Sequence, residues 1–157
     1  MTDWFAVDHP NVERLLAKWG WLCPHVMSLV ARNAFGDLFL RDEAGEIHRL
    51  DVDIGKLLKV ADSEAHFKEL ATEKGDEWFA ESDERAGAAR GLKPSLTECI
   101  GFSTPLVVCT NPRLPNEPYI LDLYEHVAFL GDLNQQIASL PDGAEVRLVI
   151  GAKPHSD

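Results

Sequence analysis

The fold is decided by the stretch at residues 34–60, which reads AFGDLFLRDEAGEIHRLDVDIGKLLKV. Apolar residues recur at short intervals along it, and turn-forming residues interrupt it at 42–45 and 53–55. Such a pattern is typical of short strands joined by tight reversals of the chain. We therefore predict a strand over 35–40, a second over 47–54 that forms a hairpin with it, and a third over 56–60.

The flanking segments predict helices. Pro10 suits the first turn of a helix that carries Val12, Leu15, Leu16 and Trp19 and ends at Gly20. Ser63 is a helix cap, and residues 63–90 read as one or two helices with a break at Gly75. Asp122 and Glu125 form a capping box before an apolar arc that runs to Leu140. Further strands are expected at 106–109, 119–121 and 146–150.

These elements predict a single compact α+β domain with a mixed or antiparallel sheet and flanking helices. At 157 residues the chain has the size of one domain. We divide it into an N-terminal helical segment at 1–32, the α+β domain at 33–151 and a disordered tail at 152–157. The N-terminus has no basic stretch followed by an apolar run, so we expect the protein in the cytoplasm.

The charge of the chain is strongly negative and unevenly distributed. The net charge is −11, and residues 37–84 carry 15 acidic against 6 basic residues, a net of −9. Phosphate backbones and anionic membranes repel such a chain, which argues against direct binding to nucleic acid or to a membrane. A basic protein is the partner that this charge favours, although acidity also serves solubility alone.

A search for reactive groups finds no convincing constellation. His48, Asp51 and Asp53 are close in sequence, but along a strand His48 points to the opposite face, so we predict no metal. His126 follows Glu125 on a helix, where neighbours point about 100° apart, and it lies in the apolar arc as a core histidine. Cys23, Cys99 and Cys109 have no disulfide or zinc-finger spacing. We predict no catalytic residue and no cofactor.

Four segments carry a resemblance to a known family. They are 33–40 (NAFGDLFL), 51–59 (DVDIGKLLK), 99–102 (CIGF) and 122–131 (DLYEHVAFLG). Together they resemble the immunity-protein family of type VI secretion DNase toxins, over roughly residues 30–150. Members often have a longer N-terminal domain, whereas about thirty residues precede the matching region here. The resemblance implies an antitoxin that binds a cognate effector, and it supplies no catalytic residues.

The charge pattern and the resemblance lead to one functional hypothesis. A nuclease needs a cationic surface to hold phosphates, so an acidic inhibitor that covers this surface gains in encounter rate and in specificity. We expect the acidic residues of the 37–84 region to face a basic nuclease toxin. The candidate partner-binding residues are Glu69, Glu73, Asp76, Glu77, Glu81, Glu84, Asp42 and Glu43.

Two other hypotheses stay open from the sequence. In the first, the chain is a regulatory or scaffold module that binds a protein other than a toxin. In the second, it is an enzyme or a small-molecule binder with a pocket near His126 and Cys99.

Overall fold

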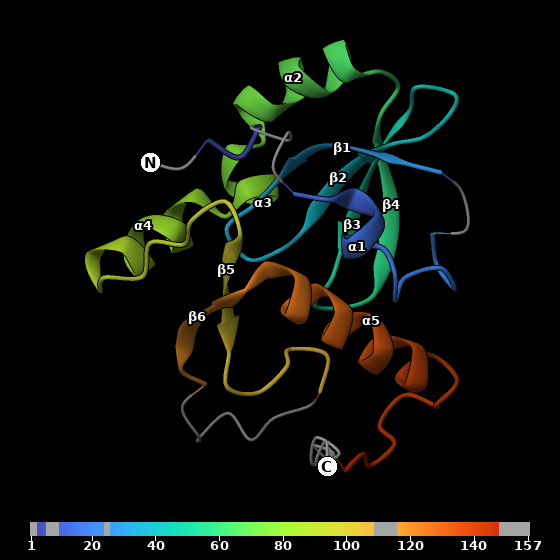
Figure 1. The fold of residues 1–157 in the computed structure, drawn as a ribbon, viewed down its shortest axis with the longest axis vertical. Helices are drawn as coiled ribbons and strands as arrows, with labels where there is room; N and C mark the ends of the chain where they lie inside the picture. The colour runs from blue at the N-terminus through green and yellow to red at the C-terminus, as the bar shows by residue number, and fades with distance from the viewer. Residues whose placement is uncertain (1–2, 6–9, 24–25, 109–115, 148–157) are drawn as a thin grey trace, which may run out of the picture.

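A computed structural model describes residues 3–5, 10–23, 26–108 and 116–147 of the chain. It confirms the α+β class, with one four-stranded and one two-stranded antiparallel sheet (Figure 1). The strands are β1 (Ser28–Arg32), β2 (Leu38–Arg41), β3 (Ile47–Asp51), β4 (Lys56–Ala61), β5 (Glu98–Phe102) and β6 (Pro118–Asp122). The helices are α1 (Val12–Leu15), α2 (Glu64–Glu73), α3 (Gly75–Phe79), α4 (Glu81–Ala89) and α5 (Leu123–Ala138).

The four-stranded sheet is a meander in the order β1-β2-β3-β4. The predicted hairpin is confirmed as β2 and β3, with Leu38 opposite Leu50 and Leu40 opposite His48. The turn between them contains Gly45 at a φ of +86°, a left-handed conformation that glycine adopts without steric cost. The predicted third strand is β4. Residues 1–32, set apart in the sequence, also supply β1, which pairs with β2.

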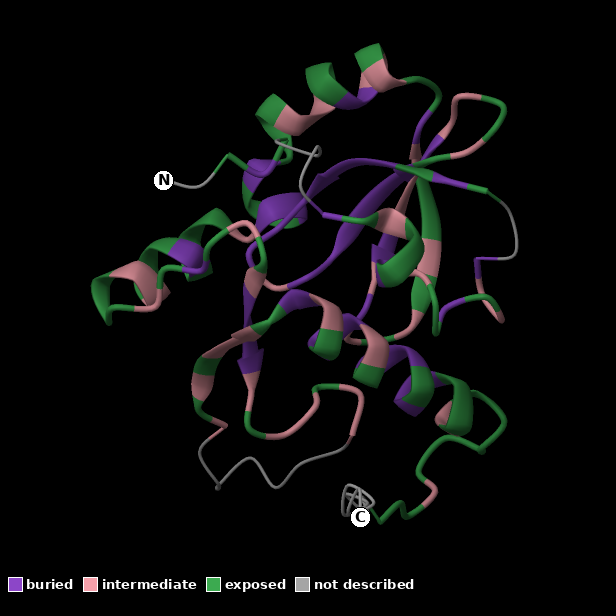
Figure 2. Ribbon diagram, in the orientation of Figure 1, coloured by how far each residue is buried: buried purple, intermediate pink, exposed green. Residues whose placement is uncertain are grey.

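Each face of this sheet packs against helices, because side chains alternate along a strand. On one face, Phe39 and Ile47 pack with Phe67 of α2 and with Trp78 and Phe79 of α3. The rings of Phe39 and Phe67 lie 5.1 Å apart. The sheet is therefore the middle layer of the main body of the molecule. β1 and β2 are mostly buried, whereas the edge strand β4 is largely exposed or half-buried (Figure 2).

The opposite face of the sheet is covered by α5 and by the α1 region. Leu38, Leu40 and Leu50 pack there with Val127 and Leu130 of α5. The predicted cap of α5 is confirmed, since the Asp122 carboxylate accepts a hydrogen bond from the Glu125 backbone N–H at 3.0 Å. Leu140, placed in the same arc, lies beyond the end of the helix and is exposed.

The N-terminal helix is much shorter than predicted. α1 ends at Leu15, and the side chain of Asn11 caps it by accepting the Arg14 N–H. After α1 the chain makes tighter turns, such as the hydrogen bond from Trp19 N–H to the Leu16 carbonyl at 2.9 Å. These turns bring the Trp19 indole N–H to the Val127 carbonyl, 2.8 Å away, and so fix this region to α5.

Several other element predictions are corrected. Residues 63–90 form three helices, not one or two. Residues 98–102, where no strand was predicted, form strand β5. Of the strand predicted at 106–109, residues 106–108 form a turn, because Val108 N–H bonds to the Pro105 carbonyl at 3.1 Å, and Cys109 lies outside the described residues. Residues 146–147 are not in a strand, and 148–150 and the tail 152–157 lie outside the described residues.

Candidate functional site

The acidic helices follow one another along one side of the molecule. α2, α3 and α4 cover residues 64–89, where eight acidic residues outnumber three basic ones, a net of −5. Phe67 of α2 and Trp78 and Phe79 of α3 pack against the sheet, and most carboxylates of the three helices lie on the outer side. Figure 2 shows exposed positions along α2 and α4. The helices therefore display most of their negative charge at the surface, with Glu84 as the buried exception.

Local sequence explains where each helix begins and ends. The Ser63 hydroxyl accepts the His66 N–H at 3.1 Å and starts α2, while Lys74 ends it. Gly75, buried at the first turn of α3, lies so close to the Glu81 carboxylate that a Cβ would sit 2.8 Å from its oxygen. Ala80 then adopts a left-handed conformation, with φ +49° and ψ +46°, which separates α3 from α4.

Five of the predicted partner-binding residues form one exposed set, which we call the acidic face. Its members are Glu69, Glu73, Asp76, Glu77 and Glu81. Glu77 forms an ion pair with Lys74 at 3.0 Å. Asp76 accepts the Ser82 N–H at 2.8 Å, and this hydrogen bond lowers the pKa of Asp76. Among the described residues, Glu69, Glu73 and Glu81 have no ion-pair partner. The acidic face therefore keeps charge available for a partner.

The prediction that Glu84 lies on the exposed side of these helices with the other candidate residues is wrong. Glu84 is buried, at 9% exposure, and both of its carboxylate oxygens accept the Trp4 indole N–H, at 3.1 and 2.9 Å. The reason is the break at Ala80, which turns α4 so that this side chain points inward to the N-terminal segment. Without the break, helical spacing from Glu73 and Glu77 would have kept Glu84 outside.

The two remaining predicted residues lie in the β2–β3 turn. Asp42 accepts the Glu46 N–H at 2.9 Å and contacts His48 Nε2 at 2.8 Å, so it stabilises the turn. The hydrogen bond with His48 lowers the pKa of Asp42. Glu43 is exposed. The neighbouring Arg41 lies 3.4 Å from Glu64 at the start of α2, which places this turn beside the first end of the acidic helices.

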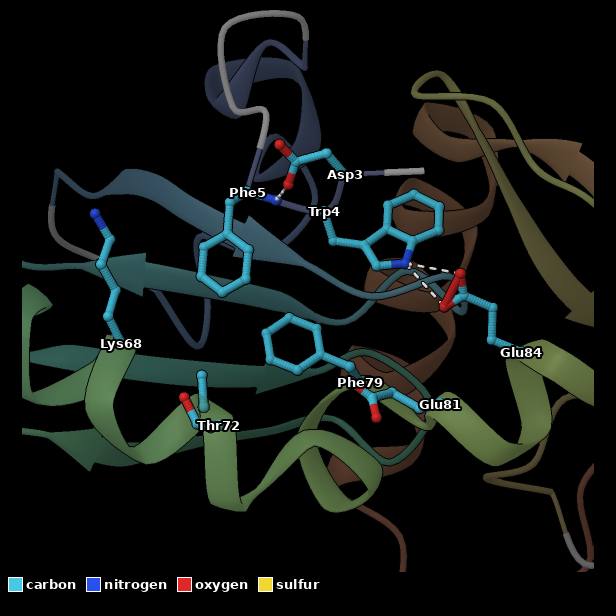
Figure 3. A pocket seen from close by; sticks show the side chains of 9 residues that line it. Asp3, Trp4, Phe5, Lys68, Thr72, Phe79, Glu81 and Glu84 are labelled. Carbon is cyan, nitrogen blue, oxygen red and sulfur yellow. Dashed lines mark hydrogen bonds between the residues drawn. The ribbon is translucent and has the colours of Figure 1, made fainter. Parts of the chain in front are cut away.

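A cavity of about 410 Å³ lies between the N-terminal segment and the acidic helices (Figure 3). Its walls are formed by Asp3, Trp4, Phe5, Lys68, Ala71, Thr72, Phe79, Glu81 and Glu84. The sequence did not predict this cavity, because nothing in the pattern of residues 3–5 indicates where that segment packs. The available signal was Trp4, a large aromatic residue outside every predicted helix and strand.

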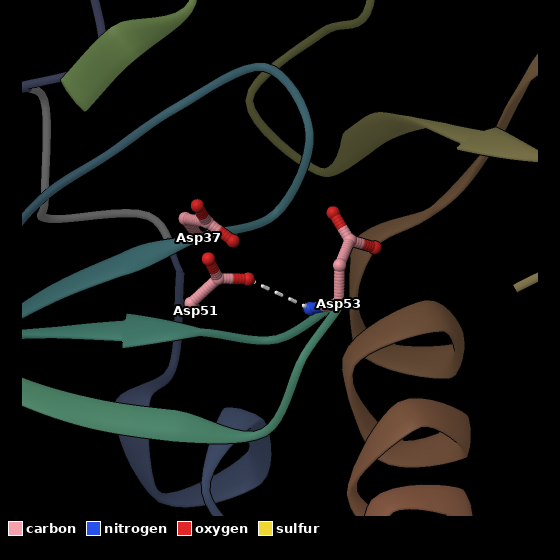
Figure 4. A group of neighbouring side chains, drawn as sticks. All are labelled: Asp37, Asp51 and Asp53. Atoms are coloured by element: carbon pink, nitrogen blue, oxygen red, sulfur yellow. Dashed lines mark hydrogen bonds between the residues drawn. The ribbon is translucent and has the colours of Figure 1, made fainter. Parts of the chain in front are cut away.

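Three carboxylates come together at the ends of β2 and β3 (Figure 4). Asp37, Asp51 and Asp53 each offer an oxygen, and these atoms all lie within 4.8 Å of one another. The prediction that His48 points away from Asp51 and Asp53 agrees with its contact to Asp42. Asp37, not identified from the sequence, takes its place.

The hydrogen-bond partners of these carboxylates give the cluster a structural role. Asp37 accepts a hydrogen bond from Arg49 at 2.7 Å and one from the Val52 N–H at 3.2 Å. Asp51 accepts the Asp53 N–H at 3.2 Å. Burial, followed by the charges of Asp37 and Asp51, raises the pKa of Asp53 to about 7. The cluster thus holds the strand ends together and places one carboxyl group where its ionisation is costly.

His126 and Cys99 are buried side chains with suppressed ionisation. Burial lowers the pKa of His126 to about 4 and raises the pKa of Cys99 to about 12. The His126 Nε2 atom has no hydrogen-bond partner within the described part of the chain. Neither residue lines any of four cavities found in that part.

Comparison of the chain with protein-family models, with curated proteins and with solved structures finds no match in any of the three. Among the described residues, no helix combines the length and apolar character that crossing a bilayer requires.

Proposed function

We propose that this protein is an immunity-type inhibitor that binds a basic nuclease toxin through the acidic face. The observation that supports it is the unpaired charge of that face: Glu69, Glu73 and Glu81 are exposed and have no cationic partner among the described residues. The proposal assigns binding and no catalytic step to the chain.

Charge complementarity is the physical reason for this choice of partner. A nuclease presents lysine and arginine side chains to the phosphates of its substrate, and an inhibitor that covers them must match that potential. Opposite fields accelerate the encounter of two proteins and disfavour wrong partners. Exposed carboxylates without internal partners meet this need, since they need not first break ion pairs of their own.

The folded scaffold supports the same role. The aromatic cluster of Phe39, Phe67, Trp78 and Phe79 fixes α2 and α3 to the sheet, so the carboxylates on their outer sides are held at set positions. A preorganised surface loses less conformational entropy on binding than a flexible one, and more of the contact energy then appears as affinity. The acidic face is thus a rigid surface rather than a charged tail.

The test is a matched pair of charge-reversal variants and a secreted nuclease encoded next to this chain. The first variant is Glu69→Lys/Glu73→Lys/Glu77→Lys on the acidic face. The control is Asp132→Lys/Asp142→Lys/Glu145→Lys, three exposed residues at and beyond α5, which changes the net charge equally. Association rates with the nuclease are measured at low and at physiological salt, together with growth of cells that express both proteins.

We expect association at low salt to slow by about tenfold or more for the first variant and by less than about twofold for the control. The difference shrinks at higher salt because exposed charges are screened. Equal slowing of association for both variants would show that the acidic face is not part of the interface. Failure of the unmodified chain to protect cells or to bind the nuclease would refute the proposed function itself.

A further inference from the structure

We infer that the cavity beside Trp4 binds an arginine side chain of the partner protein. This inference rests on the proposed function and deepens it, because it assigns one specific contact next to the acidic face. Three features of the cavity carry it: the carboxylates in its walls, its aromatic surfaces and the position of its only lysine.

The carboxylates in the cavity walls have acceptor capacity left over. Each carboxylate has about four lone-pair sites. Asp3 uses one oxygen to accept the Phe5 N–H at 3.0 Å, and Glu84 shares both oxygens with the single N–H of Trp4. The Glu81 carboxylate has no hydrogen bond or ion pair within the described residues. A cationic group with several donors can therefore enter without displacing an internal bond.

The cation within the cavity wall is already engaged elsewhere. Lys68 lies 3.5 Å from Glu64, one helical turn earlier on α2, and its side chain is 60% exposed. Figure 3 shows Lys68 on the side of the cavity away from Trp4 and Glu84. The buried Arg32, which lies over the Trp4 ring, balances part of the charge of Glu84. The carboxylates of Asp3 and Glu81 form no ion pair among the described residues, so the cavity favours a positively charged occupant.

Aromatic surfaces select a guanidinium over an ammonium group. Phe5 and Phe79 line the cavity, with ring centroids 5.5 Å apart, and Phe5 is 39% exposed. A planar, weakly hydrated guanidinium stacks on an aromatic ring while its edge donates to carboxylates, whereas an ammonium is a compact and strongly hydrated point charge. The same molecule contains such a contact, because the Arg32 guanidinium lies 4.4 Å from the centre of the Trp4 ring.

The experiment is a titration of the full chain with N-acetyl-arginine methylamide, followed by NMR at the Trp4 indole N–H and at the backbone amides. The matched probes are the lysine and citrulline analogues, the second of which lacks the charge. The matched variants are Glu81→Gln, in the cavity wall, and Asp83→Asn, an exposed residue of α4 that does not line the cavity. Retained amide spectra show that both variants fold.

We expect saturable shifts centred on Trp4, Phe5 and Phe79, with an affinity of about 1 mM for the arginine probe and weaker binding of both analogues. Glu81→Gln should lower the affinity for the arginine probe about fivefold, and Asp83→Asn should lower it less than about twofold. Equal effects of the two variants, equal binding of citrulline, or shifts scattered over α2 and α4 would overturn the inference.

These outcomes are separable from those of the proposed function. Arginine that does not enter the cavity refutes the inference, while the acidic face can still bind the nuclease and protect cells. Conversely, arginine binding at Trp4 by a chain that fails to bind the nuclease refutes the proposed function alone.

Discussion

The indole N–H of Trp4 donates to both carboxylate oxygens of Glu84, at 3.1 and 2.9 Å, and so joins residues that are 80 positions apart in the chain. Both side chains are buried, and the Arg32 guanidinium lies over the Trp4 ring. The carbonyl of Trp4 also accepts the Arg32 N–H at 3.0 Å, at the edge strand β1. The N-terminal segment is therefore fixed between the sheet and α4.

Trp4→Phe should destabilise the protein by about 1–3 kcal/mol, because it leaves the Glu84 carboxylate buried without its donor. Urea unfolding followed by circular dichroism measures the free energy of unfolding of the variant and of the unmodified chain. A cost below a few tenths of a kcal/mol would show that the hydrogen bond contributes little.

The double variant Trp4→Phe/Glu84→Met serves as its control. Replacing both partners by apolar groups removes the unsatisfied carboxylate, so the double variant should be more stable than Trp4→Phe alone. If it is less stable than Trp4→Phe alone, Glu84 has a stabilising contact other than Trp4.

The strands and caps that the sequence predicted correctly depend on short-range signals. The β2–β3 hairpin follows from the apolar residues that flank Asp42 and Gly45, and the α5 start follows from the spacing of Asp122 and Glu125. Each of these signals is contained within about ten residues, where spacing alone determines which groups meet.

The errors arise where tertiary packing overrides local pattern. In a continuous helix, the spacing of Glu84 from Glu73 and Glu77 would keep its side chain exposed. The left-handed Ala80 instead turns α4 and buries Glu84 against Trp4, and no local pattern connects these two residues. Asp37 joins Asp51 and Asp53 only because β2 and β3 pair in one particular register. The cavity beside Trp4 could not be predicted for the same reason, since its walls come from segments far apart in sequence.

Ala80→Gly should stabilise the protein by about 0.5–1 kcal/mol. The left-handed conformation costs an alanine about 1–2 kcal/mol, and glycine avoids this cost but gains some freedom in the unfolded chain. The control is Ala86→Gly in α4, which should destabilise by about 0.5–1 kcal/mol because a helix disfavours glycine. Thermal unfolding compares the two, and a loss of stability in both would contradict the strain assigned to Ala80.

Asp37→Ala should destabilise the protein by about 2–4 kcal/mol, because it leaves the Arg49 guanidinium and the buried Val52 N–H without their acceptor. The cost comes from these lost bonds and not from the charge, since burial, followed by the charge of Asp51, raises the pKa of Asp37 and outweighs the opposite effect of Arg49. Urea unfolding is compared with that of Asp62→Ala, a change at an exposed ion pair with Lys59, which should cost less than about 1 kcal/mol. Similar costs for the two variants would contradict a structural role of Asp37.

Asp53→Asn should stabilise the protein at pH 8 and have little effect at acidic pH. Burial, with the charges of Asp37 and Asp51, raises the pKa of Asp53 to about 7 in the folded protein, against about 4 for an unfolded chain. Between these two pH values the folded state holds a proton that the unfolded state has lost. The contribution of Asp53 to stability therefore decreases as the pH rises from about 4 to about 7 and stays unfavourable above.

The measurement is the difference in unfolding free energy between Asp53→Asn and the unmodified chain from pH 5 to pH 8, and we expect it to grow to about 1–3 kcal/mol. Taking the difference cancels the opposite effect of His126, whose pKa of about 4 makes the protein lose stability as the pH falls below about 6.5. A difference that does not change with pH would mean that Asp53 titrates near its ordinary value, and that the cluster with Asp37 and Asp51 does not hinder its ionisation.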